Sequence, residues 1–243
     1  MSESSRDARH LALTQVGPAG QARIAAGSIL LIGAGGIGCA AGQYLVSSGV
    51  GRVTICDFDT VDATNLGRQV LYGPDDIGKS KVRVAGTRLA ATNPDVEITI
   101  IDARLDDAAL AKLIANVDVV LDGSDNFATR FQVSDACVAG GRCLVSGAAI
   151  RLEGQLAVFG PDYATTPCYR CLYSEANESL ENCAGNGVLA PVPGVIGTLM
   201  AVETLKQLAG LEVQRGRLLL FDAGSSDFRS VGIPKRGNCP ACN

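Results

Sequence analysis

Short apolar segments alternate with segments of helical character through the first half of the chain, and this alternation constrains the fold more than any other feature. The apolar segments are residues 28–33, 52–57, 96–101, 117–121 and 142–146. The helical segments between them are residues 36–48, 80–92, 106–115 and 127–139. Apolar strands separated by helices are typical of a parallel sheet covered on both faces. We therefore expect an α/β fold with a doubly wound, Rossmann-like sheet.

The pattern changes after Gly147. Residues 154–159, 217–221 and 227–233 have the pattern of strands, and residues 195–209 that of a long amphipathic helix. We expect these strands to form a C-terminal antiparallel extension of a mainly parallel sheet. No repeat or linker divides the sequence, so we expect one domain over residues 1–243. Its parts are an N-terminal arm and helix (1–27), an α/β core (28–150) and a C-terminal part (151–243).

Charge and hydropathy exclude several classes of protein. The 243 residues include 21 Lys and Arg against 25 Asp and Glu, and the pI is about 5.1. An acidic chain is a poor general nucleic-acid binder, because phosphate contacts need a basic face. No segment approaches the ~18 consecutive apolar residues of a membrane helix, and the polar N-terminus lacks the apolar core of a signal peptide. We expect a cytoplasmic protein with reduced cysteines.

A glycine-rich run, GAGGIG at residues 33–38, follows the first predicted strand and opens the first predicted helix. Gly33, Gly35 and Gly38 have the G-x-G-x-x-G spacing, and Asp57 ends the second strand. This combination predicts a nucleotide site, with phosphate at the helix N-terminus and the acid on ribose hydroxyls. It does not distinguish NAD from ATP. The alternative is a glycine turn that serves only close packing of helix on sheet.

The loop after the second strand carries an unusual set of polar residues. DFDTVDATNLGRQ, at residues 57–69, contains Asp59, Asn65 and Arg68, and Lys81 follows in the next predicted helix. A nicotinamide enzyme needs few cations beyond its ribose acid, whereas cations neutralise the charge that develops on a triphosphate. The loop therefore favours ATP. The alternative is a solvated loop with ordinary surface charges.

The fourth strand runs into DGSDN, at residues 122–126. Ligands bind at the carboxyl edge of such sheets, and Asp122 and Asp125 there would suit a magnesium ion that bridges phosphate oxygens. An Asx turn that caps the following helix is the alternative, and it is compatible with Asn126 and with Asp125. The residues alone leave both readings open.

Four cysteines form two C-x-x-C pairs, Cys168 with Cys171 and Cys239 with Cys242. Four thiolates in this arrangement predict a tetrahedral, structural zinc site. The alternative is a pair of redox dithiols, which normally begin a helix in a thioredoxin-like unit, and we expect neither pair to do so.

The segment 167–193 is too long for an ordinary loop and is expected to be functional or mobile. It contains Cys183, which is either a nucleophile or a small residue that fits, and the spacing favours the inert reading. The other cysteines lie in apolar contexts and are expected in the core; they are Cys39, Cys56, Cys137 and Cys143. His10 is the only histidine, which excludes a Ser-His-Asp hydrolase and a His-based zinc hydrolase.

Taken together, these motifs resemble those of the ThiF/MoeB/HesA adenylyltransferases, bacterial relatives of the ubiquitin-activating enzymes. The resemblance runs from about residue 6 to residue 242. It is carried by Arg9-His10, GAGGIG, DFDTVDATNLGRQ, GKSKV, DGSDN, SGAAIRLEGQ, PCYRC, NCAGNGVLAPVPGVIGT and the final CPAC.

The resemblance implies an adenylyltransferase that activates the C-terminal glycine of a small ubiquitin-like sulfur carrier protein. The carrier would be MoaD-type or ThiS-type, for molybdopterin or thiamine thiazole synthesis, and the product an acyl-adenylate with release of pyrophosphate. The carboxylate nucleophile is already ionised at pH 7, so this reaction needs no general base. That requirement agrees with a chain that has a single histidine.

Site residues follow from the same resemblance. Gly35, Gly36 and Gly38 would lie along ATP, Asp57 on the ribose hydroxyls, and Asn65, Arg68 and Lys81 on the phosphates. Asp125 would hold Mg²⁺. We expect Asn126, the next residue, and Asp59, in the loop after the second strand, to face the nucleotide as well. Cys168, Cys171, Cys239 and Cys242 match structural Zn²⁺ ligands. Cys183 matches a cysteine that in some members bonds covalently to the activated carrier.

Partners are also implied. Arg9 matches an arginine that dimers of the family supply from the neighbouring subunit, so we expect a homodimer. No rhodanese-like domain follows Asn243, so sulfur would come from a separate sulfurtransferase or cysteine desulfurase. The alternatives are an NAD(P)-dependent Rossmann oxidoreductase, a non-catalytic scaffold and an ATP-dependent tRNA-modifying relative, the last disfavoured by the acidic pI.

Overall fold

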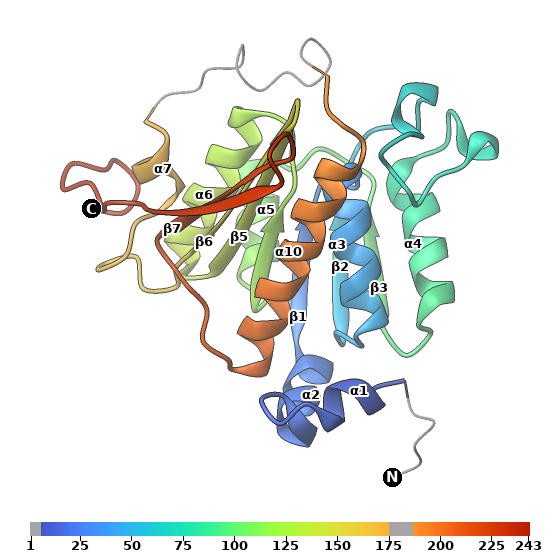
Figure 1. Ribbon diagram of the computed structural model, residues 1–243, viewed down its shortest axis with the longest axis horizontal. Coiled ribbons are helices and arrows are strands. Elements are labelled where there is room, and N and C mark those ends of the chain that lie inside the picture. Colours follow the sequence, from blue (N-terminus) through green and yellow to red (C-terminus); the bar gives the residue numbers. More distant parts are fainter. Residues whose placement is uncertain (1–5, 175–186) are drawn as a thin grey trace.

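The computed structural model describes residues 6–174 and 187–243 (Figure 1). Its strands form one eight-stranded sheet in the order β3-β2-β1-β4-β5-β6-β7-β8. The strands are β1 (Ser28–Ile32), β2 (Arg52–Cys56), β3 (Glu97–Ile101), β4 (Val119–Asp122), β5 (Cys143–Ile150), β6 (Glu153–Phe159), β7 (Arg217–Asp222) and β8 (Asp227–Gly232). The helices are α1 (Ala8–Ala12), α2 (Gly17–Ala26), α3 (Gly36–Ser47), α4 (Lys81–Thr92), α5 (Asp107–Ile114), α6 (Phe127–Gly140), α7 (Tyr169–Leu172) and α10 (Pro191–Ala209).

The five strands from β1 to β5 are parallel, as the alternating pattern predicted. β1 pairs with β2 on one side and with β4 on the other. The chain thus reverses its direction of winding between β1 and β4, which is where sheets of this class bind ligands at the strands' carboxyl ends. All five residues of β1 are buried, since helices cover both of its faces.

The antiparallel extension is also confirmed. β5, β6, β7 and β8 are joined in sequence by antiparallel pairing. β5 runs to Ile150, four residues beyond its predicted end, because it continues into a tight turn to β6 at Arg151, whose φ is 53°. β8 is one of the two edge strands of the sheet, and every one of its residues is exposed.

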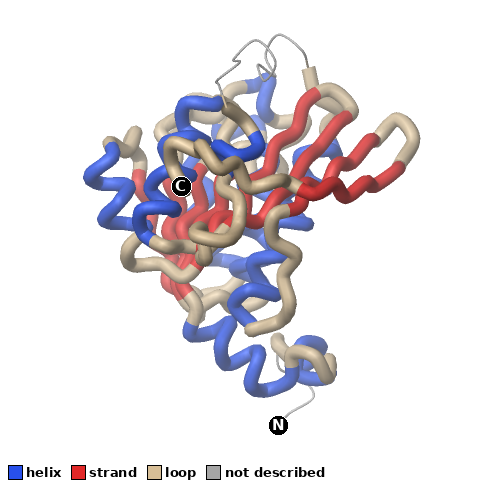
Figure 2. Tube along the Cα trace, turned by 90° about the vertical axis from the view of Figure 1, so that its left-hand side faces the viewer, coloured by secondary structure: helices blue, strands red, loops and turns tan. Residues whose placement is uncertain are grey.

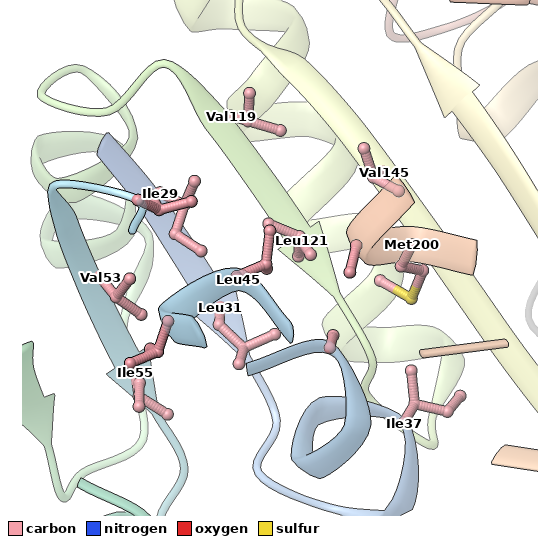
Figure 3. Packing of buried hydrophobic residues seen from close by; sticks show 14 of the residues in the cluster. Ile29, Leu31, Ile37, Leu45, Val53, Ile55, Val119, Leu121, Val145 and Met200 are labelled. Carbon is pink, nitrogen blue, oxygen red and sulfur yellow. The ribbon is translucent and has the colours of Figure 1, made fainter. Parts of the chain in front are cut away.

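Helices cover the sheet in two layers (Figures 1 and 2). The larger core lies between the sheet and α2, α3, α4 and α10, and Figure 3 shows Leu45 and Met200 from this layer against Leu31 and Leu121. The second core lies on the opposite face, under α5, α6 and α7. In the described part of the chain no helix is both long enough and apolar enough to cross a membrane.

Helix α10 begins at Pro191, earlier than the sequence pattern indicated, and packs on α3 through a glycine. Proline is accepted in the first turn of a helix because the N–H it lacks would have no partner there. A Cβ built on Gly197 would lie 2.2 Å from the carbonyl oxygen of Ile37 and 3.0 Å from the Cβ of Ala40. The two helices therefore meet backbone against backbone at this point.

Gly197→Ala should accordingly destabilise the fold, whereas Gly194→Ala in the same helix should not. A Cβ at Gly194 meets nothing within 4 Å, and alanine favours the helix by roughly 0.5–1 kcal/mol over glycine. Overpacking at Gly197 should lower the free energy of unfolding by about 1–3 kcal/mol. Guanidinium denaturation of both variants measures this. Equal midpoints would contradict the close contact of α10 with α3.

Candidate active site and metal centre

A cavity of about 540 Å³ opens at the carboxyl ends of β1, β2 and β4. Three loops that follow these strands line it, together with the start of α4 and residues from α5, α6 and α10. Of the predicted nucleotide-binding residues, the structure brings eight together here. They are Gly35, Gly36, Asp57, Asp59, Arg68, Lys81, Asp125 and Asn126.

The glycine loop delivers the N-terminus of α3 to the cavity. Gly33 has φ +89°, a conformation that residues with a side chain rarely adopt. A Cβ on Gly38 would lie 1.9 Å from the carbonyl oxygen of Gly33. The absence of a side chain at Gly38 therefore permits close packing of α3 on the loop. Gly38 is not among the residues that line the cavity. The first N–H groups of α3 have no partner within the helix and favour an anion.

Asp57 faces the cavity from the end of β2. Its Oδ2 accepts a hydrogen bond from the backbone N–H of Ala34 (2.7 Å), and its Oδ1 accepts one from the N–H of Asp59 (2.8 Å). Burial raises the pKa of Asp57, although these two N–H groups oppose the rise. The carboxylate thus joins the glycine loop to the loop after β2.

Two cations of the cavity already have partners in the chain. Lys81 Nζ lies 2.9 Å from Asp59 Oδ2, and the lysine side chain is 8% exposed against 51% for the aspartate. Arg68 Nη1 donates to the carbonyl oxygen of Thr64 (2.8 Å). These contacts orient both cations before any ligand binds.

Asn65 is placed differently from the expectation that it lines the nucleotide site. Its Oδ1 accepts a hydrogen bond from the N–H of Asp62 (3.2 Å), and Asp62 in turn accepts from Thr64. This pair of bonds closes a capping box around the short 3₁₀ helix Ala63–Asn65. Asn65 is not among the residues that line the cavity, and it shapes the loop from which Arg68 projects.

The turn after β4 separates the two acids that the sequence placed together. Asp125 is exposed to the cavity, and its Oδ1 accepts from Asn126 Nδ2 (3.3 Å). Asp122 is buried beneath the turn, where desolvation raises its pKa. The capping alternative also holds in part, because Asn126 Oδ1 accepts from the N–H of Thr129 (2.9 Å) at the start of α6. Of the two acids in this turn, Asp125 is therefore the one that offers an exposed carboxylate of the type that magnesium binds.

Several lining residues were not predicted. The Arg104 guanidinium lies 4.2 Å from the centroid of the Phe58 ring, and both side chains line the cavity. Gln69 is buried beside the glycine loop, and Gln132 of α6 donates to Asp107 Oδ1 (2.8 Å). Arg104 comes shortly after the end of β3. Its position near the carboxyl end of a predicted strand could therefore have indicated that it lies at the cavity.

A smaller hollow, which we call the groove, adjoins the cavity. Its volume is about 180 Å³, and it runs over β5, β6 and β7. Arg130 and Ala149 line both spaces. Tyr173 closes one side of the groove and donates from its hydroxyl to Gln155 Oε1 (2.8 Å). The groove therefore leads from the outer strands of the sheet to the cavity.

Arg9 and His10 lie far from this cavity. They belong to α1, and α2 leads directly into the amino end of β1. The cavity is at the carboxyl ends of the strands, and five residues of β1 separate the two ends by about 15 Å. Figures 1 and 2 both show the N-terminal helices beyond the lower end of the sheet. The chain thus does not bring its own Arg9 to its own cavity.

The four cysteines of the two C-x-x-C pairs do come together. Their Sγ atoms all lie within 4.8 Å of one another. Cys168 and Cys239 are 3.5 Å apart at sulfur, and Cys171 and Cys242 are 3.6 Å apart. A tetrahedron with Zn–S bonds of about 2.3 Å has sulfur atoms about 3.8 Å apart. The cluster fits zinc, and none of its cysteines is in a disulfide.

Neighbouring groups donate hydrogen bonds to sulfur atoms of this cluster. The N–H of Arg236 donates to Cys171 Sγ (3.4 Å), and Lys235 Nζ lies 3.4 Å from Cys242 Sγ. Arg170, between the first two cysteines, forms two hydrogen bonds of 2.7 Å to Asp135 of α6. Cys168 is the N-cap residue of α7, a helix of only four residues, and its side chain forms no capping hydrogen bond. The two hydrogen bonds between Arg170 and Asp135 therefore hold the cysteine cluster against α6.

The remaining cysteines divide into two groups. Cys39, Cys56, Cys137 and Cys143 are buried, as expected of core residues. Burial raises the pKa of Cys39 and of Cys56 to about 11, so both thiols stay protonated at neutral pH. Cys183 lies outside the described residues.

The metal site can be tested directly. Wild-type protein should contain about one zinc per chain and Cys171→Ser about none, because three ligands bind the ion much less tightly than four. Cys137→Ala, which removes a core thiol outside the cluster, is the control and should retain the metal. Elemental analysis by mass spectrometry gives both values. Full zinc content in Cys171→Ser would contradict this assignment.

Comparison with known proteins agrees with these features. The chain is 46% identical over 244 residues to "Adenylyltransferase and sulfurtransferase MOCS3" of Bos taurus, with 99% of the chain covered but only 53% of that protein. It is 45% identical to "Molybdopterin-synthase adenylyltransferase" of Escherichia coli, over 92% of the chain and 90% of that protein. It is 40% identical to "Sulfur carrier protein ThiS adenylyltransferase" of Escherichia coli, over 98% and 94%. The chain thus spans about half of the first relative and nearly all of the others.

Solved structures show the same fold. Escherichia coli MccB, in a crystal structure described as containing ATP, superposes with a TM-score of 0.86 at 22% identity, over 100% of the chain and 75% of MccB. The model of the ThiF family matches residues 8–241, which include the glycine loop, the cavity and three of the four cluster cysteines. The chain therefore belongs to the ThiF family.

Proposed function

We propose that the protein uses ATP to adenylate the C-terminal glycine of a small ubiquitin-like sulfur carrier protein. The observation that carries this proposal is the convergence of Asp57, Arg68, Lys81 and Asp125 on one cavity at the N-terminus of α3. An oxidoreductase would leave most of these charges unused. The named activities of the relatives that the chain matches over nearly their whole length support the same reaction.

Each residue has a part in binding ATP. Asp57 is placed to accept hydrogen bonds from the ribose hydroxyls, and the N-terminus of α3 favours phosphate. Lys81 and Arg68 would neutralise the charge that grows on the leaving pyrophosphate, which is the main demand of this reaction. Asp125 would hold a magnesium ion, which supplies further positive charge at the phosphate oxygens.

The nucleophile is the carrier's own carboxylate, and it is ionised at neutral pH. No group of the cavity then has to remove a proton, and His10 lies at the other end of the sheet. The chain's task is to bring two anions together in line, which positioning and fixed cations achieve. The groove is the path we assign to the carrier's tail, because it adjoins the cavity at Arg130 and Ala149, and its volume of about 180 Å³ suits a segment with small side chains.

Three further proposals concern partners. We infer a homodimer, because Arg9 lies at the amino ends of the strands and can approach such a cavity only from a second chain. We infer that sulfur comes from a separate sulfurtransferase or cysteine desulfurase. We also infer that the carrier is either MoaD-type or ThiS-type, as the names of the relatives suggest.

Lys81→Ala should lower the rate of pyrophosphate exchange into ATP by about 100-fold or more, since a cation fixed at the developing charge is lost. Arg83→Ala is the matched control. Arg83 lies two positions further along the same helix. Its side chain is 70% exposed and pairs with Asp102 outside the cavity. A rate near that of wild type for Lys81→Ala, in folded protein, would remove Lys81 from the site.

The substrate is tested by the same exchange reaction with no carrier, with a MoaD-type carrier and with a ThiS-type carrier. We expect exchange that depends on a carrier with a free C-terminal glycine, because the carboxylate is the nucleophile. Deletion of that glycine should abolish exchange. Activity with one carrier identifies the pathway, and activity with neither, in zinc-loaded protein that binds ATP, would contradict the proposed substrate.

A further inference from the structure

Two buried charged side chains hold the turn between β4 and α6, and the reaction proposed above assigns no part to either. The N–H of Ser124 donates to Asp122 Oδ1 (3.0 Å). The carbonyl oxygen of Ser124 accepts from Arg130 Nε (3.2 Å) and Nη2 (2.7 Å). Both polar groups of this residue's backbone are therefore bound by side chains of opposite charge.

Burial makes this arrangement costly and specific. Asp122 is 1% exposed and Arg130 is 3% exposed. Removing charges from water is unfavourable unless each charge finds good partners. The Asp122 hydrogen bond to the Ser124 N–H forms the turn. The guanidinium of Arg130 adds a second restraint, at the carbonyl oxygen of the same residue.

The position of Arg130 indicates what that is. Ser124 directly precedes Asp125, whose carboxylate is exposed in the cavity. Arg130 lines both the cavity and the groove, and its guanidinium lies 5.9 Å from the ring centroid of Phe127, another groove residue. The side chain thus stands between the two spaces in which the reactants meet, and it holds the residue next to the exposed carboxylate.

We propose that Arg130 is a positioning residue that acts through the Ser124 carbonyl to hold the Asp125 carboxylate where it meets the magnesium ion of ATP. This inference rests on the proposed function, in which Asp125 holds the ion. The planar guanidinium directs two N–H groups at one carbonyl oxygen, whereas a lysine ammonium at the end of a flexible chain does not fix that direction.

Arg130→Lys keeps the charge and loosens the hold on the turn. The matched control is Arg23→Lys. Arg23 also directs Nε and Nη2 at one carbonyl oxygen, that of Ala209, but it lies in α2, away from the cavity. Zinc-loaded wild-type protein and both variants are compared in three measurements. The first is the magnesium concentration that half-saturates pyrophosphate exchange, the second is amide hydrogen exchange at residues 123–126 without nucleotide, and the third is the affinity for ATP without magnesium.

In Arg130→Lys we expect the half-saturating magnesium concentration to rise about tenfold, as for loss of one charge-assisted hydrogen bond. Amide exchange at residues 123–126 should become faster, while the affinity for ATP measured without magnesium stays within about twofold of wild type, since the site of the loss is the ion's ligand. Arg23→Lys should match wild type in all three quantities.

An unchanged magnesium requirement, or unchanged amide exchange in the turn, would overturn the inference. So would a lower maximal rate with a normal magnesium requirement, because that result assigns Arg130 a role other than holding Asp125. If wild type itself shows no exchange with any carrier, the proposed function fails, and the amide measurement still tests the hold on the turn. If amide hydrogen exchange in Arg130→Lys becomes faster throughout the chain, the variant is unfolded as a whole. Arg130→Gln, which keeps an amide NH₂ group as donor, then replaces it.

Discussion

The cavity depends on the close approach of helix α3 to the strand that precedes it. That approach is possible because Gly38 has no side chain, since a Cβ there would lie 1.9 Å from the Gly33 carbonyl oxygen. Helix α10 then rests on α3 through Gly197, and this places Pro193 against the glycine loop at Gly36. The contact of Gly38 with Gly33 thus fixes the glycine loop that lines the cavity, and the contact of Gly197 with Ile37 fixes the position of Pro193 beside that loop. Such contacts tolerate little adjustment, because no side chain can move aside.

Much of this arrangement could be predicted because it is recorded locally in the sequence. The central strands β1 and β4 carry a continuous apolar pattern and are buried along their whole length, and the glycine loop has fixed spacing. The cluster of Cys168, Cys171, Cys239 and Cys242 could be predicted despite its long separation, because thiolate chemistry restricts what two C-x-x-C pairs can do. The position of Asp57 at the cavity could be predicted from its spacing after the glycine loop, and that of Asp125 from the meeting of strand ends at one edge of a parallel sheet.

Other features depend on neighbours that are distant in sequence. Asp122 and Asp125 look alike in DGSDN, yet the pleat and the turn bury one and expose the other. The burial of Lys81 against Asp59 and the contact of Arg104 with Phe58 follow from loop packing, for which no periodicity exists. The side chain of Asn65 caps the short helix because its Oδ1 accepts a hydrogen bond from the N–H of Asp62. Whether a short polar side chain bonds to the nearby backbone or to a ligand cannot be read from its spacing in the sequence.

The cysteine cluster also has a consequence for the unfolded chain. Its sulfur contacts join positions 71 residues apart, and the chain between them includes α10, β7 and one border of the groove. A metal that closes such a loop removes conformational entropy from the unfolded state, by about 4 kcal/mol if it restrains the chain as a covalent link would. The hairpin of β7 and β8, which buries little surface of its own, thereby gains stability from a cross-link between the segments before and after it.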